Sequence, residues 1–171
     1  MRNPVFCCNQ ILRWDLYDGE CLCSRFHVQE WNKMVSDIYS DAEWKKFLTE
    51  YNDVVKCYIL RTNHDDKEIA FVYLYNESGS FDIVSIHGGG WNKSIGLSIL
   101  YYRGLILMIE TLLKQNVKVR TTCMSSNTRA YNFLRSVGFV KYSYVDDVIC
   151  MWINEKRLMQ SSIYKRYCKQ S

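Results

Sequence analysis

The chain has 171 residues, 48% of them hydrophobic, which is enough for one substantial core and short of two typical domains, so we expect one domain over residues 1–171. The net charge of +4 comes with neither a dense basic patch for nucleic acid nor an acidic stripe for polyamines, and it slightly favours anionic ligands. Because there is no apolar signal segment, no membrane-length apolar run and no metal-site cysteine spacing, the sequence predicts a soluble cytoplasmic protein with reduced thiols, no membrane contact and no metal.

The N-terminal third predicts two short helices, because apolar and aromatic residues recur at helical spacing over 30–38 and 41–51. Three strands follow at 54–60, 68–75 and 81–86, which are rich in β-branched and aromatic residues. Their separators, NHDDK and NESGS, are typical of turns. We therefore expect three successive strands joined by hairpins.

The second half of the chain predicts a different alternation. A glycine run at 88–90 indicates a flexible loop before a long helix over 96–115, a strand over 117–122 and a helix over 127–136. Strands at 139–145 and 148–153 then close the chain as a hairpin that turns at Asp146 and Asp147. This order predicts an α/β fold of the α+β layered type, since helices do not separate the strands regularly.

The most specific pattern lies around the helix at 127–136. Asn127, Ala130, Phe133, Gly138 and Phe139 stand at spacings that resemble the signature helix of the GNAT acetyltransferases. The same residues have structural explanations: Ser126 or Asn127 caps the helix, Ala130 allows close packing, and Gly138 ends the helix in a left-handed conformation. The resemblance implies a GNAT-like, mixed and largely antiparallel splayed sheet flanked by helices, with acetyl-CoA as co-substrate.

A second stretch resembles the loop with which this family holds the coenzyme pyrophosphate. Lys93, Ser94, Gly96 and Ser98 open the long helix, where backbone N–H groups and the helix dipole attract phosphate. Lysine stands where the family has glutamine or arginine, and serine stands at the last small position. Gly88 belongs to a glycine run that offers another way of wrapping the phosphates, and a plain strand-to-helix turn is the structural alternative. Asn127 completes the predicted coenzyme-binding set.

The resemblance also places the pantetheine arm of the coenzyme. It implies pairing with the strand backbone near Ile86 and His87, and a V-shaped gap between the strand ending at His87 and the strand starting at Val117. Acetyl thioester and acceptor amine would meet in that gap. Ser85 shares the face of His87.

Two residues are predicted to carry the chemistry. His87 suits a base for the amine proton, although a histidine at a strand end also serves as a polar cap, and Asp82 is the second choice. The usual acid of the family, a tyrosine, is replaced by Leu134, so Tyr131 one turn earlier is the substitute, with packing as its alternative role. Cys123 has no adjacent base, and we expect it to pack.

Three functions remain open from the sequence. The leading one is an N-acetyltransferase in which a primary amine, on a small molecule or a peptide, attacks acetyl-CoA directly. The second is a catalytically inactive GNAT-fold protein that senses coenzyme A or binds proteins, as Leu134 and Ser98 suggest. The third is an unrelated interaction protein, which predicts no gap. Aromatic residues near Tyr142 and Tyr144 are compatible with a homodimer. Aromatic residues of the N-terminal part, such as Trp14, are expected to lie in the core or to line the acceptor pocket.

Overall fold

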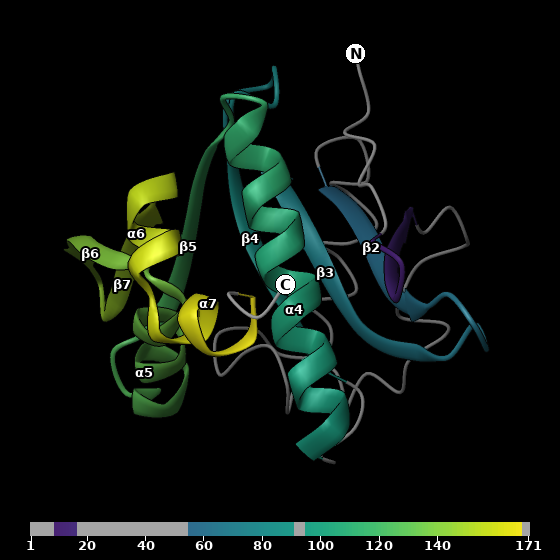
Figure 1. Ribbon diagram of the computed structural model, residues 1–171. Helices are drawn as coiled ribbons and strands as arrows, with labels where there is room; N and C mark the ends of the chain where they lie inside the picture. Colours follow the sequence, from purple (N-terminus) through teal and green to yellow (C-terminus); the bar gives the residue numbers. More distant parts are fainter. Residues whose placement is uncertain (1–8, 17–54, 91–94, 169–171) are drawn as a thin grey trace, which may run out of the picture.

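The computed structural model describes residues 9–16, 55–90 and 95–168 (Figure 1). The helices predicted at 30–38 and 41–51 lie outside these residues, as do Lys93 and Ser94 of the predicted phosphate loop. Within the described part of the chain, no helix combines the length and apolarity that a membrane span requires.

Seven strands form one mixed sheet in the order β1-β2-β3-β4-β5-β7-β6. Its one parallel pair is β4 with β5, and the other neighbours are antiparallel. The predicted largely antiparallel sheet is therefore confirmed. The strands are β1 (Leu12–Leu16), β2 (Val55–Thr62), β3 (Glu68–Asn76), β4 (Ile83–Gly90), β5 (Lys118–Met124), β6 (Val140–Val145) and β7 (Val148–Ile153).

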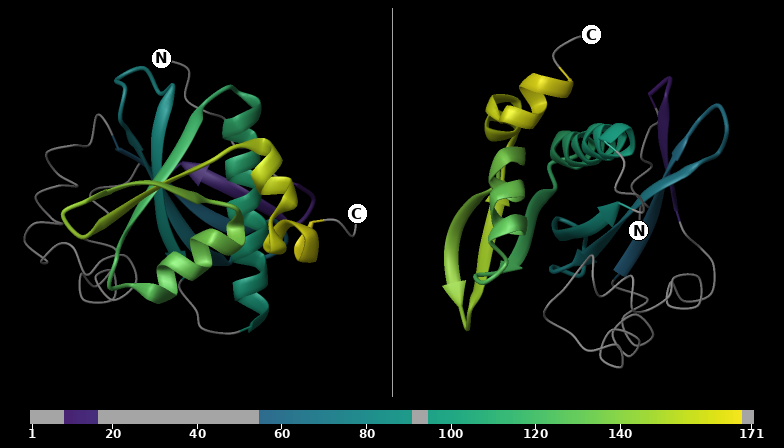
Figure 2. Two further views of the ribbon diagram at one scale, coloured as in Figure 1. Left: turned by 90° about the vertical axis from the view of Figure 1, so that its left-hand side faces the viewer. Right: turned by 90° about the horizontal axis from the view of Figure 1, so that it is seen from below.

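The helices of the described residues lie on one side of this sheet (Figure 2). They are α4 (Ile95–Lys114), α5 (Thr128–Val137), α6 (Glu155–Gln160) and α7 (Ser162–Tyr167). The long helix α4 crosses the sheet, and its apolar stripe is buried at Leu105, Met108, Ile109 and Leu112, which are spaced by three or four residues.

The close approach of α4 to the sheet depends on Gly104. A β-carbon at this position would lie 2.4 Å from a methyl carbon of buried Leu60 on β2. The indole N–H of buried Trp14 donates a hydrogen bond of 2.8 Å to the Gly104 carbonyl. Trp14 is therefore a core residue, and its polar group is satisfied by the helix that it supports.

Two expectations about the elements were wrong, and one strand was not predicted. The glycine run is strand, not loop, because Gly88 pairs with Val72 of β3 and the next two glycines continue that pairing. The short strand β1 was not predicted. The hairpin does not close the chain, because Asn154 caps α6 by accepting a hydrogen bond from the backbone N–H of Arg157, and Leu158 and Ile163 bury the apolar sides of α6 and α7.

Candidate functional site

The strands β4 and β5 separate after three residue pairs. Their parallel register runs from the pair of Ile83 and Lys118 to the pair of Ser85 and Arg120. From Ile86 to Gly90, β4 pairs with β3 alone among the described strands. The strands β5 to β7 consequently spread away from β1 to β4 (Figure 2). The predicted divergence between β4 and β5 is thus confirmed.

A side chain bridges the two strands where their pairing stops. The hydroxyl of Thr121 on β5 donates a hydrogen bond of 2.8 Å to the carbonyl oxygen of Ile86 on β4. Both residues are buried. This contact replaces the next backbone hydrogen bond of the ladder, and it fixes the point at which the strands diverge.

His87 lies one residue beyond this point, on the sheet face opposite α4. Its Nε2 is 2.9 Å from the hydroxyl oxygen of Ser85, and its ring stacks on Tyr73 with centroids 5.1 Å apart. Burial lowers the pKa of His87 from 6.5 to about 4. The imidazole is therefore neutral near pH 7.

The N-termini of α4 and α5, which belong to the predicted coenzyme site, lie at the open end of the diverging strands (Figure 1). The helix α4 begins at Ile95 after the end of β4, and α5 begins after the end of β5. Gly96 is exposed, and apart from its own helix backbone and chain neighbours, no atom of the described residues lies within 4 Å of the place where its β-carbon would be. Ser98 is half-buried one turn into the helix. This end of α4 therefore offers room for a ligand beside its first turn.

Asn127 has a structural function. Its side-chain oxygen accepts a hydrogen bond of 3.0 Å from the backbone N–H of Ala130, which caps α5. The helix ends at Gly138, whose φ of +111° is left-handed. Both ends of the signature helix are thus as predicted.

The helix α5 joins α4 through aromatic rings. Phe133 contacts Tyr101 and Tyr102 of α4, with ring centroids 6.3 and 5.5 Å apart. Tyr131 is half-buried, and the guanidinium carbon of Arg135 lies 5.9 Å from the centre of its ring. Tyr131 therefore lies on the helix that begins at the open end, and its ring also packs against the core and Arg135.

The expectations for Cys123 and Ser85 agree with their contacts. Cys123 is buried, and burial raises the pKa of its thiol, so it is a packing residue as expected. Ser85 shares the face of His87 and hydrogen-bonds to it. The alternation of strand residues predicts this common face, whereas the stacking of Tyr73 depends on the register of β3 with β4 and was missed.

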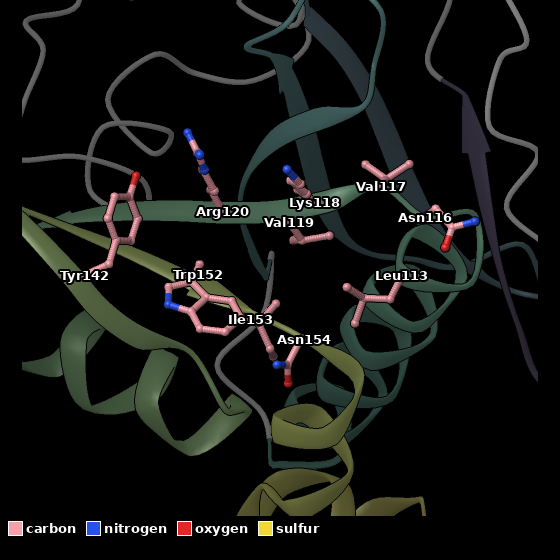
Figure 3. Close-up of a pocket in the computed structure, with 10 residues that line it drawn as sticks. All are labelled: Leu113, Asn116, Val117, Lys118, Val119, Arg120, Tyr142, Trp152, Ile153 and Asn154. Carbon is pink, nitrogen blue, oxygen red and sulfur yellow. The ribbon is translucent and has the colours of Figure 1, made fainter.

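A pocket of about 470 Å³ lies at the closed end of the diverging strands (Figure 3). It runs from the aromatic side chains of β6 and β7, past the start of β5, to the loop after α4. Its lining residues are Leu113, Asn116, Val117, Lys118, Val119, Arg120, Tyr142, Trp152, Ile153 and Asn154. Sequence patterns do not predict this pocket, because three separate segments form it, namely residues 113–120, Tyr142 and residues 152–154.

No family model matches this sequence, and no curated protein has a significantly similar sequence. Similarity is found among solved structures. Apo FdhC, described as a nucleotide-linked sugar GNAT, has a TM-score of 0.61 and 16% identity over 92% of this chain and 95% of that chain. A dodecameric spermidine N-acetyltransferase from Vibrio cholerae has a TM-score of 0.57 and 14% identity over 89% and 98% of the two chains. The N-acetyltransferase PseH from Campylobacter jejuni has a TM-score of 0.55 and 11% identity over 84% and 98%.

Proposed function

We propose that this chain, which has the GNAT fold of these N-acetyltransferases, moves an acetyl group from acetyl-CoA to a primary amine by direct attack. One observation carries the proposal: β4 and β5 stop pairing after Ser85 and Arg120, next to the first turns of α4 and α5. The divergence leaves the edge of β4 from Ile86 onward without a β5 neighbour. An extended amide-containing ligand pairs readily with such an edge.

The coenzyme would bind along this edge and across the start of α4. Its pantetheine amides would pair with the backbone at Ile86 and Gly88. Its pyrophosphate would contact the first backbone N–H groups of α4 at Gly96 and Ser98, where the helix dipole favours negative charge. The open space beside Gly96 supports this placement. Lys93, Ser94 and Asn127 complete the proposed set.

The reaction needs one proton acceptor and one proton donor. The amine nitrogen attacks the thioester carbonyl carbon, the N–C bond forms, and the C–S bond then breaks. His87 is neutral and close to the divergence, so it would accept the proton that the amine loses. Tyr131 would give its proton to the departing thiolate, in place of the tyrosine that Leu134 replaces. A thiolate is a weak base compared with an alkoxide, so this step needs little help.

The neighbours are consistent with amine acceptors of different kinds. One is described as a nucleotide-linked sugar GNAT and another as a spermidine N-acetyltransferase. We propose that this chain also takes an amine on a small molecule or a peptide. The dodecameric neighbour and the half-exposed Tyr142 and Tyr144 on the outer strand β6 support a homo-oligomer, with a dimer as its simplest form.

Calorimetric titration with acetyl-CoA and with coenzyme A tests the coenzyme site. We expect the wild type to bind both, and Gly96→Glu to lose binding because it adds bulk and negative charge beside the pyrophosphate. Gln160→Glu, which adds the same charge on exposed α6, is the matched control and should bind normally. Binding should then be followed by turnover of an amine, and His87→Ala should lower kcat by about 100-fold or more.

Each other outcome identifies a different function. Coenzyme binding without turnover of any amine would favour an inactive, coenzyme-sensing protein. Failure of the wild type to bind either form of the coenzyme would overturn the enzyme proposal and favour a protein-interaction module with this fold.

A further inference from the structure

The pocket at the closed end shares one residue with the point where β4 and β5 diverge. Arg120 lines the pocket and is also the β5 partner of Ser85, the residue that hydrogen-bonds to His87. Paired residues in a ladder point to the same face of a sheet. Arg120 and His87 therefore lie on the same face, separated along the sheet by two residues, or about 7 Å.

The two charged side chains that line this mainly apolar pocket are both basic. Lys118 and Arg120 leave β5 on the same side in Figure 3, and the described residues give Lys118 no ion-pair partner. The guanidinium of Arg120 forms an ion pair of 2.9 Å with Glu77. Arg157 adds a further cation nearby, because its guanidinium carbon lies 5.4 Å from the centre of the Trp152 ring. Both charged residues that line the pocket are therefore basic, which favours an anionic ligand.

Two aromatic side chains supply flat apolar surface in the same place. Tyr142 and Trp152 line the pocket on the side of β6 and β7 (Figure 3). Arg120 already lies over the ring of Tyr142, at 5.6 Å from its centre. The side-chain amides of Asn116 and Asn154 add hydrogen-bonding groups at the opposite rim. Rings with cations beside them suit a ligand that combines a planar group with negative charge.

We infer that this pocket holds the acceptor, and that the acceptor is an amine on a phosphate-bearing molecule with a planar ring. The inference rests on the proposed acetyl transfer. It selects one acceptor class, because a polyamine would place its cations against Lys118 and Arg120. Two cations on one face of β5 can each contact one phosphate of a diphosphate, whereas a single carboxylate would engage fewer of these donors.

Binding of model ligands tests the pocket independently of turnover. Uridine 5′-diphosphate, uridine, inorganic pyrophosphate and spermidine are titrated calorimetrically, each with coenzyme A present at saturation so that the coenzyme site takes no nucleotide. We expect uridine 5′-diphosphate to bind most tightly, pyrophosphate and uridine each to bind at least about tenfold more weakly, and spermidine not to bind.

Variants then show where the ligand binds. Lys118→Gln and Arg120→Gln should each weaken uridine 5′-diphosphate at least about tenfold, because each removes one charge-assisted contact. Trp152→Ala should weaken the nucleotide but not pyrophosphate. The matched control is Lys141→Gln, which removes an exposed cation on β6 outside the pocket, and it should leave binding unchanged.

Three results would overturn the inference: no binding of uridine 5′-diphosphate, tighter binding of spermidine, or nucleotide binding that neither Lys118→Gln nor Arg120→Gln weakens. The acetyl-CoA titration described above tests the proposed function, and its outcome can be distinguished from the outcome of the nucleotide titration. Acetyl-CoA binding without nucleotide binding leaves the proposed function intact and removes this acceptor class. Nucleotide binding without acetyl-CoA binding would overturn the proposed function and, with it, the assignment of the nucleotide as an acetyl acceptor.

Discussion

Thr121 and Ile86 join β5 to β4 through one side-chain hydrogen bond of 2.8 Å, at the first position where the two backbones no longer pair. Ile86 is buried, so without the Thr121 hydroxyl its carbonyl oxygen would have neither a backbone N–H nor water as a hydrogen-bond donor. The divergence of the sheet therefore carries a small energetic cost at this point, and Thr121 offsets it. The proposed coenzyme edge begins directly beyond.

Replacement of Thr121 by valine should destabilise the protein. Valine keeps the shape but removes the donor, and an unsatisfied buried carbonyl costs about 1 to 3 kcal/mol in the free energy of unfolding. Thr121→Ser keeps the hydroxyl and should cost less. Urea unfolding of the three proteins measures the difference. Equal stabilities of the valine variant and the wild type would show that the carbonyl finds another donor.

The signature helix could be predicted almost to the residue, because its ends depend on local chemistry. Asn127 accepts the hydrogen bond that a helix start needs, and Gly138 supplies the left-handed residue that ends it. The turn at Asp146 and Asp147 is local in the same sense, and both residues have positive φ. Such features need no knowledge of distant strands.

Features that depend on distant partners were missed. The glycines of β4 have low strand propensity, but β3 pairs with them, and this pairing overrides propensity. The helices α6 and α7 were not predicted, because each has only six residues and so shows little helical periodicity. The pocket around Arg120 and Trp152 is formed by segments far apart in the chain. The expectation that His87 ends its strand was wrong, because the pairing of β4 with β3 continues to Gly90, and the contact of His87 with Tyr73 depends on the same register.

Gly88 and Gly96 should respond differently to alanine, although both were predicted to bind the coenzyme. A β-carbon at Gly88 would lie 2.3 Å from the backbone oxygen of Phe71, whereas one at Gly96 would meet nothing within 4 Å. Gly88→Ala should therefore lower the free energy of unfolding by about 2 kcal/mol or more without any ligand. Gly96→Ala should stabilise or leave it unchanged. Thermal unfolding of the ligand-free proteins checks both, and a stable Gly88→Ala protein would contradict the strand geometry.

Acid should destabilise the protein through His87. Its folded pKa of about 4 is below the unfolded value of 6.5, so the unfolded state binds the proton more readily between these values, and stability falls as pH falls from about 6.5 toward 4. Between pH 7.5 and 5 the loss from this residue is about 2 kcal/mol. The His87→Gln variant lacks this titrating group, so its free energy of unfolding should fall by about 2 kcal/mol less than that of the wild type between these pH values. Urea unfolding at both pH values compares them, and parallel losses would mean that His87 is not held neutral.

Tyr131→Phe separates a proton donor from a packing residue. Phenylalanine keeps the ring beneath Arg135 and the contacts with the core, and it removes only the hydroxyl. If Tyr131 protonates the thiolate as proposed, kcat should fall about 10- to 100-fold while the KM for acetyl-CoA and the melting temperature stay unchanged. Tyr144→Phe, on the exposed side of β6, is the matched control and should keep full activity. Full activity of Tyr131→Phe would assign Tyr131 to packing and leave the thiolate to take its proton from water.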